Sequence, residues 1–273
     1  AKKYPELREA VRFIRDLTLL EREQGERVPE YKPALTEKEK QELKEGLLAG
    51  QPVSQVCPVP VDPALFERIF REMGAVLRRH LPHKAPEIDR VMEVPWDFAR
   101  LLELFQASDL EGFARELEQR QVAPALFHFL FNHALKPFYR RYAREMKAFV
   151  DEEHWLRSIC PVCGHRPVMA RLMGEGGRRH LVCGLCDTVW AYRRLECPYC
   201  GAGHEELREI TVEGEPLYRL HVCNRCRGYV KSLDVRELPE GERVSELDDM
   251  AGALLDLVAE REGYTRTPDV SAQ

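Results

Sequence analysis

Eight of the nine cysteines in this 273-residue chain fall into four C-x-x-C pairs. Such a turn places two thiolates on one side of a tight knuckle, and thiolates bind metal ions such as zinc and iron. The pattern C-x2-C-x19-C-x2-C is followed by C-x2-C-x22-C-x2-C, an internal repeat. We expect one small four-cysteine metal-binding unit used twice, with these ligands: Cys160, Cys163, Cys183 and Cys186 in the first site, and Cys197, Cys200, Cys223 and Cys226 in the second.

A glycine follows the first knuckle of each unit, at Gly164 and Gly201. Glycine permits the positive φ that lets backbone N–H groups point at sulfur. Each unit has about 40 residues, a size that seldom folds unaided, so bound metal should supply much of its folding free energy. We expect the three additional residues of the second unit to lie in its middle hairpin.

Other uses of paired cysteines fit less well. Disulfides require an oxidising compartment, and the first residues, AKKYPELREAVRFIRDL, do not resemble an export signal, which favours the cytoplasm. A thioredoxin-like redox pair needs a single C-x-x-C at the start of a helix. Within the repeat, two sequential sites close shorter loops than an interleaved arrangement of 160/163 with 197/200, which stays open.

Catalytic chemistry has little support in the sequence. We find no Ser-His-Asp arrangement, phosphate-binding glycine loop or paired-carboxylate motif, so we expect no catalytic residue, no organic cofactor and no enzyme activity. His165 and His204 follow the two first knuckles, but four sulfurs already complete each site, so we expect neither histidine to be a ligand. The Asp248-Asp249 pair fits the negative charge favoured at a helix N-terminus.

Helical periodicity and helix caps run through the first 150 residues. The stretch 51–63 is proline-rich and is interpreted as an ordered linker, and Pro137 should kink or divide its helix. Predicted helices cover residues 5–24, Thr36 to near Gly50, a segment capped by Asp62, 96–107, a segment capped by Ser108, and 123–149.

From about residue 155 the pattern changes to β-forming residues. Predicted strands cover 180–183, 188–196, 207–213, 218–223 and 228–235, and a helix runs from Ser245 to a glycine cap at Gly263. The fold class is therefore α+β. The expected domains are a helical domain (1–154), a first metal module (155–196), a second metal module (197–240), a C-terminal helix (241–264) and a tail (265–273).

Charge and hydropathy limit the possible partners. The net charge is −5, and the two signs nearly balance across the cysteine-rich region, which argues against a phosphate-backbone binder. No stretch approaches the roughly 20 apolar residues that span a bilayer. Four aromatic residues of the metal modules fit a protein interface at least as well as nucleic acid: Trp190, Tyr192, Tyr199 and Tyr229.

The cysteine-rich region contains three distinctive patterns: CPVCG and CPYCG, C-x-x-C-x-T-x-W from Cys183 to Trp190, and C-x-x-C-x-x-Y-x-K from Cys223 to Lys231. These patterns carry a resemblance to the formate dehydrogenase accessory protein FdhE family. It extends to the whole chain in layout and to residues 155–240 in detail. It implies two rubredoxin-like modules, so that iron is as plausible as zinc, and it carries the eight cysteines over as metal ligands.

The resemblance also implies a function. Members of this family are cytoplasmic and non-catalytic, and they assist maturation of a molybdenum- or tungsten-containing formate dehydrogenase by contacting its catalytic subunit. The expected partner is therefore that subunit, with no membrane association and no nucleic acid; the oligomeric state is open. The alternatives are a nucleic-acid-binding zinc-ribbon protein and a rubredoxin-type electron carrier.

Overall fold

The computed structural model describes residues 8–213, 216–238, 248–249, 252–266 and 268. The chain forms two compact units. We call them the helical unit (Ala1–Thr36 with Ser54–Met146) and the sheet unit (Glu37–Val53 with Lys147–Gln273). The α+β class, with helices first and cysteine-bearing strands after them, is confirmed.

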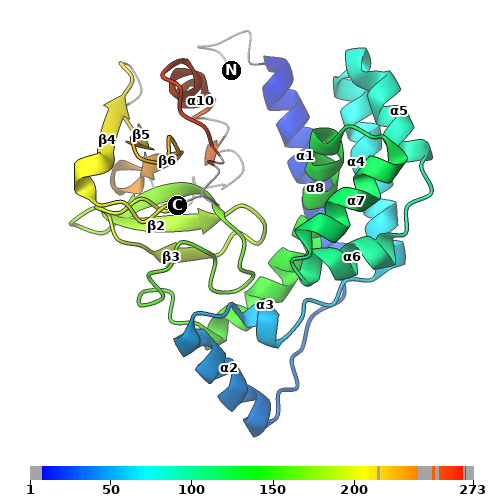
Figure 1. Ribbon diagram of the computed structural model, residues 1–273, viewed down its shortest axis with the longest axis horizontal. Helices are drawn as coiled ribbons and strands as arrows, with labels where there is room; N and C mark the ends of the chain where they lie inside the picture. The colour runs from blue at the N-terminus through cyan, green and yellow to red at the C-terminus, as the bar shows by residue number, and fades with distance from the viewer. Residues whose placement is uncertain (1–7, 214–215, 239–247, 250–251, 267, 269–273) are drawn as a thin grey trace. The chain divides into compact units, whose positions relative to one another are not determined.

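The helical unit is built around three helices, α1, α4 and α8, which pack on one another (Figure 1). Phenylalanines from α4 and α8 fill its core, with Phe66, Phe70, Phe127 and Phe131 almost wholly buried. Aromatic rings pack well here because edge-to-face and offset contacts add to area burial. The helices of this part of the chain are α1 (Arg8–Arg27), α3 (Val53–Val56), α4 (Pro63–His80), α5 (Ala85–Glu93), α6 (Phe98–Gln106), α7 (Leu110–Arg120) and α8 (Pro124–Met146).

Side-chain caps begin several of these helices. Asp62 accepts a hydrogen bond from Leu65 N at 2.6 Å, as the sequence predicted for α4. The predicted cap of α7 was wrong by one residue, because Asp109 accepts from Gly112 N while Ser108 adopts a left-handed backbone. α8 continues through Pro137 as one helix and is not divided there, since most side chains around the proline are buried and hold the helix in place.

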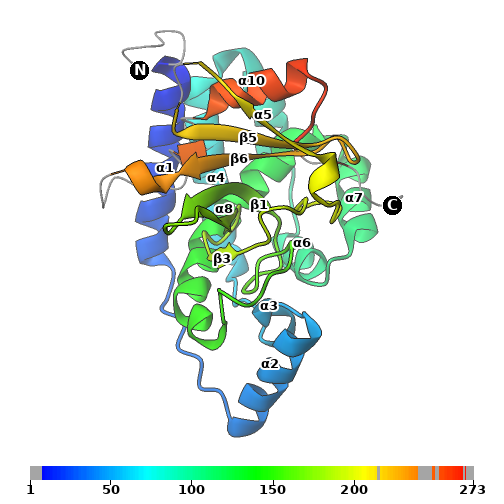
Figure 2. The ribbon, with the colours of Figure 1, turned by 90° about the vertical axis from the view of Figure 1, so that its left-hand side faces the viewer.

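The sheet unit contains one six-stranded sheet with strand order β3-β2-β1-β6-β5-β4. Two antiparallel meanders, one from each cysteine repeat, are joined by a parallel pairing of β1 with β6, seen side by side in Figure 2. β1 was not predicted from the sequence; its residues are all buried or half-buried, and Arg171 lies among them. The strands are β1 (Pro167–Met173), β2 (Arg178–Cys183), β3 (Val189–Ala191), β4 (Leu207–Thr211), β5 (Tyr218–Cys223) and β6 (Tyr229–Asp234).

Two further helices belong to the sheet unit. α2 (Glu37–Ala49) ends at Gly50, whose φ is +89°, and α10 (Ala253–Arg261) covers one sheet face with Leu255 and Ala259 against Leu220 and Val222. Gly263 ends α10 as predicted, with φ +77° and with Tyr264 N donating to Ala259 O at 2.8 Å. The predicted start of this helix at Ser245 lies outside the described residues.

The start of the predicted tail is attached to the sheet. Thr265 forms a parallel bridge to Gly228, and its N–H donates to Arg227 O at 2.8 Å. In the parts of the chain that the structure describes, no helix combines the length and the apolar character needed to cross a bilayer.

Candidate metal centres

The eight predicted cysteines gather into two groups of four. Within each group every Sγ lies within 4.8 Å of the others. A tetrahedral ion with metal–sulfur bonds of about 2.3 Å needs sulfurs about 3.8 Å apart. The recorded Sγ–Sγ distances are 3.6 Å for Cys160–Cys186, 3.4 Å for Cys163–Cys183, 3.7 Å for Cys197–Cys226 and 3.7 Å for Cys200–Cys223. The two groups are sequential, so the interleaved arrangement is excluded.

Identical backbone turns present the first knuckle of each group. Gly164 N donates to Cys160 O at 2.9 Å, and Gly201 N donates to Cys197 O at 3.0 Å. Both glycines have the positive φ that the sequence predicted, +74° and +69°. This conformation turns the chain back beside its own sulfurs, which is why glycine follows the second cysteine in both repeats.

The second knuckle of each group turns in the same way without glycine. Asp187 and Arg227, which follow Cys186 and Cys226, have φ of 60° and 56°. These two turns were not predicted from the sequence, because arginine does not favour a left-handed conformation and aspartate adopts it only occasionally. The signal available in the sequence was that both residues directly follow the last cysteine of their repeat.

Backbone and hydroxyl groups surround the sulfurs. Cys183 Sγ accepts from Leu185 N and Cys186 N, each at 3.4 Å, while Thr188 Oγ1 lies 3.1 Å from Cys186 Sγ. In the second group Tyr199 N donates to Cys197 Sγ at 3.5 Å. Such N–H···S contacts fix the orientation of metal-binding thiolates and stabilise their charge.

The ionisation of the thiols shows that a cation suits these groups. Burial raises the pKa of the Cys163 thiol and raises that of Cys226 to about 11. Burial also opposes ionisation of Cys200, but the N–H of Ala202 and the neighbouring thiols outweigh it and lower that pKa. Four closely spaced and mostly buried sulfurs can all become thiolates only with a cation among them, and an all-sulfur tetrahedral donor set fits zinc or iron.

The three additional residues of the second repeat lie before its hairpin, so the expectation that they lengthen the hairpin was wrong. Pro167 pairs with Cys183 and Leu207 pairs with Cys223, at the same separation in sequence. The extra residues fall between Cys200 and β4, where the 3-10 helix η4 (His204–Glu206) forms.

The two histidines beside the knuckles do not occupy equivalent positions. His165 O accepts from Cys160 N, and in the second repeat that place belongs to Ala202, whose oxygen accepts from Cys197 N. His204 lies in η4 with its side chain 76% exposed. Among the residues that the structure describes, both groups that could hold a metal consist of cysteines alone.

The aromatic residues expected at an interface are mostly part of the interior. Trp190 is fully buried and donates to Arg157 O at 2.8 Å, and Tyr192 and Tyr229 are also buried. Tyr199 is half-buried and donates to Tyr229 O at 3.0 Å. These rings hold the knuckles against the sheet and do not form an exposed aromatic surface.

Three arginines and one histidine line the sheet face opposite α10, beside the second group. Strand register places Arg179, Arg219 and His221 on this face, and the segment after β3 adds Arg194. Arg179 is only 2% exposed. Burial lowers its pKa to about 10, while nearby negative groups, Cys197 among them, act in the opposite direction. Four thiolates around a divalent ion carry net negative charge, and these arginines are suited to balance it.

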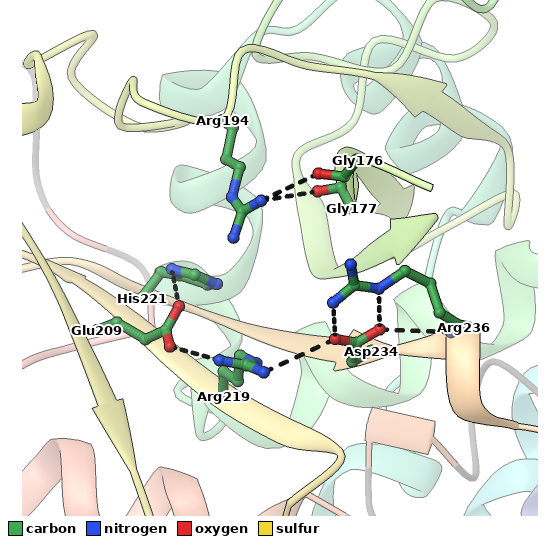
Figure 3. A network of polar contacts seen from close by, with 8 residues as sticks. All are labelled: Gly176, Gly177, Arg194, Glu209, Arg219, His221, Asp234 and Arg236. Atoms are coloured by element: carbon green, nitrogen blue, oxygen red, sulfur yellow. Dashed lines mark hydrogen bonds and ion pairs between the residues drawn. The ribbon is translucent and has the colours of Figure 1, made fainter. Parts of the chain in front are cut away.

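The same cations keep one imidazole neutral. Burial, together with the charges of Arg179, Arg194 and Arg219, lowers the pKa of His221 to about 3. Carboxylates tie the network together, as Figure 3 shows. Its contacts are Arg219 with Glu209 (2.7 Å) and Asp234 (3.7 Å), Arg236 with Asp234, His221 with Glu209 (3.8 Å), and Arg194 with the carbonyls of Gly176 (3.2 Å) and Gly177 (3.3 Å).

An ion network on the other face fixes α10. Lys231 is 1% exposed, and its Nζ lies 2.6 Å from Asp256 Oδ2 and 2.9 Å from Asp249 Oδ1. Asp248 pairs with Arg171 at 3.1 Å. The Asp248-Asp249 pair therefore serves the strands and is not only a helix-terminal charge. The ion pairs of Lys231 were not predicted from the sequence. The available signal was a charged residue inside a predicted strand.

Several known proteins with similar sequences belong to one family. The model of a family described as FdhE, central domain, matches residues 159–194. A Protein FdhE homolog from Aquifex aeolicus is 25% identical over 205 residues, 74% of this chain and 69% of that protein. A homolog of the same name from Stutzerimonas stutzeri is 33% identical over 147 residues, 52% of this chain and 47% of that protein.

A solved structure is similar over almost the full chain. The crystal structure of the FdhE protein from Pseudomonas aeruginosa gives a TM-score of 0.63 at 21% identity and covers 97% of this chain and 88% of that one. The match to a Protein FdhE homolog from Shewanella baltica (strain OS185), at 29% identity, spans 68% of this chain and 61% of that relative. The family model, these relatives and the two four-cysteine groups on one shared sheet together show that the chain is similar to proteins of the FdhE family.

Proposed function

We propose that the protein is a non-catalytic accessory protein that binds the catalytic subunit of a molybdenum- or tungsten-containing formate dehydrogenase and assists its assembly. The observation that carries the proposal is that each cysteine group is closed. Four sulfurs supply all four ligands that a tetrahedral ion takes, which is typical of structural metal sites, whereas catalytic sites keep an open position for substrate. Similarity to proteins of the FdhE family supports the named partner.

In this proposal the eight cysteines hold two ions, iron or zinc, and the place of action is the cytoplasm. The bound ion supplies cross-links between knuckles that are distant in sequence. The chain itself adds further connections: β1 and β6 pair across the two repeats, and the buried tyrosines and tryptophan fix the knuckles to the sheet. The result is a rigid surface suited to recognising another protein. We also propose the domain boundaries that the sequence predicts.

The direct test measures binding to the purified, immature catalytic subunit. Replacing Cys197 and Cys200 by serine removes half the sulfurs of the second group, so that module should unfold and capture of the subunit should be lost. Cys57→Ser is the matched control, because this cysteine lies outside both groups. Undiminished capture by the double variant would contradict the proposal for this module.

The same preparation distinguishes the two alternatives. Binding of nucleic acid with a steep salt dependence would favour a nucleic-acid-binding protein. A reversible optical signal of iron in four-sulfur coordination, without any binding of the subunit, would favour an electron carrier.

A further inference from the structure

A buried carboxylate in the helical unit is surrounded by more positive charge than is required to neutralise it. Glu21 of α1 is 2% exposed and hydrogen-bonds with His133, while Arg140 Nη1 lies 2.6 Å and Lys136 Nζ 3.8 Å from its oxygens. Burial acts to raise the pKa of Glu21, but the charge of Lys136, the hydrogen bond from His133 and the charge of Arg140 lower it to about 2. This carboxylate is ionised, and two cations already compensate it.

Next to Glu21 lies a polar cavity of about 330 Å³ between α1 and α8. Small-molecule sites in proteins begin at about 300 Å³. The cationic side chains on its wall come from both helices: Arg22 from α1, and Arg140, Arg141 and Arg144 from α8. We call this cavity the arginine pocket.

The acidic groups at the arginine pocket do not neutralise it. Of the two glutamates on its wall, Glu21 is already compensated and Glu26 is exposed. Glu30 pairs with Arg141 at 3.4 Å but is 59% exposed, and such exposed pairs contribute little. Among the described residues, the buried Nε of Arg141 has no hydrogen-bond partner. Buried polar groups are normally paired, so an additional acceptor suits this wall.

A glycine keeps one side of the pocket open. Gly25 lies on the wall, and a Cβ added there would meet no atom within 4 Å. Glycine in a helix costs roughly 0.5–1 kcal/mol relative to alanine. α1 therefore carries a helix-weakening residue at a position where a side chain would project into open space.

We propose that the arginine pocket binds a small ligand bearing phosphate or carboxylate groups, with at least two negative charges. Guanidinium groups hold such oxyanions through paired, charge-assisted hydrogen bonds. The enclosure by two helices of one unit and the volume of the pocket suit a small molecule. The four arginines on the wall exceed the two glutamates, Glu21 and Glu26, by two charges, and this excess sets the charge that the ligand should carry.

Titration calorimetry of the full-length, metal-loaded protein tests this. The probes are inorganic phosphate, pyrophosphate and citrate, each at an ionic strength held constant with chloride, so that general screening does not imitate binding. We expect saturable binding at one site for at least one probe. A phosphate ligand should make pyrophosphate the tighter probe, and a carboxylate ligand should make citrate the tighter one.

Two variants separate the pocket from general charge effects. Gly25→Leu places a side chain in the pocket without removing a charge, and should weaken binding by roughly tenfold or more while the melting temperature is kept. Arg141→Gln with Arg144→Gln should weaken it by at least as much, because hydrogen bonds to charged groups are among the stronger ones. Arg100→Gln, at an exposed arginine paired only with Glu103 in the recorded contacts, is the control and should bind like the parent.

Two results would overturn the proposal. One is the absence of saturable binding for all three probes. The other is binding that Gly25→Leu leaves unchanged, which would place the anion elsewhere on the protein.

Discussion

The left-handed glycines of the first knuckles hold the cysteines in their binding geometry, and the two sites differ in how much room they leave. A Cβ at position 201 would meet only Glu196 Oε1, at 3.9 Å, whereas one at position 164 would lie 3.0 Å from Pro52 Cγ. An L-residue in this conformation costs roughly 1–2 kcal/mol. The knuckle at Gly164 should therefore tolerate substitution less well than the knuckle at Gly201.

We predict that Gly201→Ala lowers the unfolding free energy of the sheet unit by about 1 kcal/mol, since reduced freedom of the unfolded chain offsets part of the strain. Gly164→Ala should cost more, because Pro52 must also move. The measurements are thermal unfolding and the half-time of metal transfer to a chelator. Gly176→Ala, in an open turn without positive φ, is the control. Equal effects of all three substitutions would exclude a role of knuckle geometry.

The buried Glu21 should make the helical unit sensitive to acid. Its pKa is lowered from 4.5 to about 2 in the folded state, so the folded chain holds this proton less tightly than the unfolded chain. The resulting stability is present above pH 4.5 and is lost as the pH falls towards 2. A shift of this size corresponds to something on the order of 3 kcal/mol.

The check on Glu21 compares unfolding of the parent and of Glu21→Gln between pH 6 and about 3 by circular dichroism. The variant should be less stable at neutral pH, because its partner cations lose their carboxylate, and should show a smaller loss on acidification. Metal release in acid affects both proteins alike and cancels in the difference. Parallel stability curves would rule out Glu21 as the titrating group.

At the scale of elements, α10 is tied to the sheet by charge as well as by apolar contact. Lys231 in the middle of β6 reaches Asp249 and Asp256, and Tyr229 OH donates to Asp256 at 2.7 Å. Removing one partner of a buried ion pair typically costs 3–5 kcal/mol, because the remaining charges stay desolvated. Lys231 is therefore the main cation among the contacts that attach α10 to the sheet.

Lys231→Met should loosen α10 while leaving both cysteine groups able to bind metal. Hydrogen exchange followed by mass spectrometry should show at least tenfold faster exchange in residues 253–261, with metal content unchanged. Lys38→Met, at an exposed lysine of α2, serves as the comparison. Unchanged exchange in α10 would mean that the apolar cluster of Leu255 and Ala259 holds the helix alone.

How far the sequence predicts these elements depends on whether their signal is local. Spacing predicted the cysteine groups and the glycine conformations, and caps and periodicity predicted α4 and the end of α10, because each depends on residues close in sequence. β1 was missed since Arg171 interrupts its apolar pattern. The pairing of β1 with β6 joins strands about 60 residues apart, and no local pattern specifies such a partner.

At the scale of the whole molecule, that pairing decides whether the two metal centres act separately. The sheet repeats head to tail, with β3-β2-β1 followed by β6-β5-β4. Ala170, Arg171 and Leu172 of β1 are the register partners through which the first repeat meets β6. A disturbance of the first centre should therefore reach the second repeat through β6, and it should weaken towards β4 at the far edge.

Replacing Cys160 and Cys163 by serine tests this coupling. Hydrogen exchange should accelerate strongly in β1, β2 and β3, measurably in β6, and least in β4, because each strand is protected by its neighbours. The second centre should still hold one metal ion per chain but release it faster to a chelator. Cys57→Ser should change neither measurement. Unaltered exchange in β6, with the first repeat unfolded, would mean that the modules fold independently and that the proposed recognition surface needs only one of them.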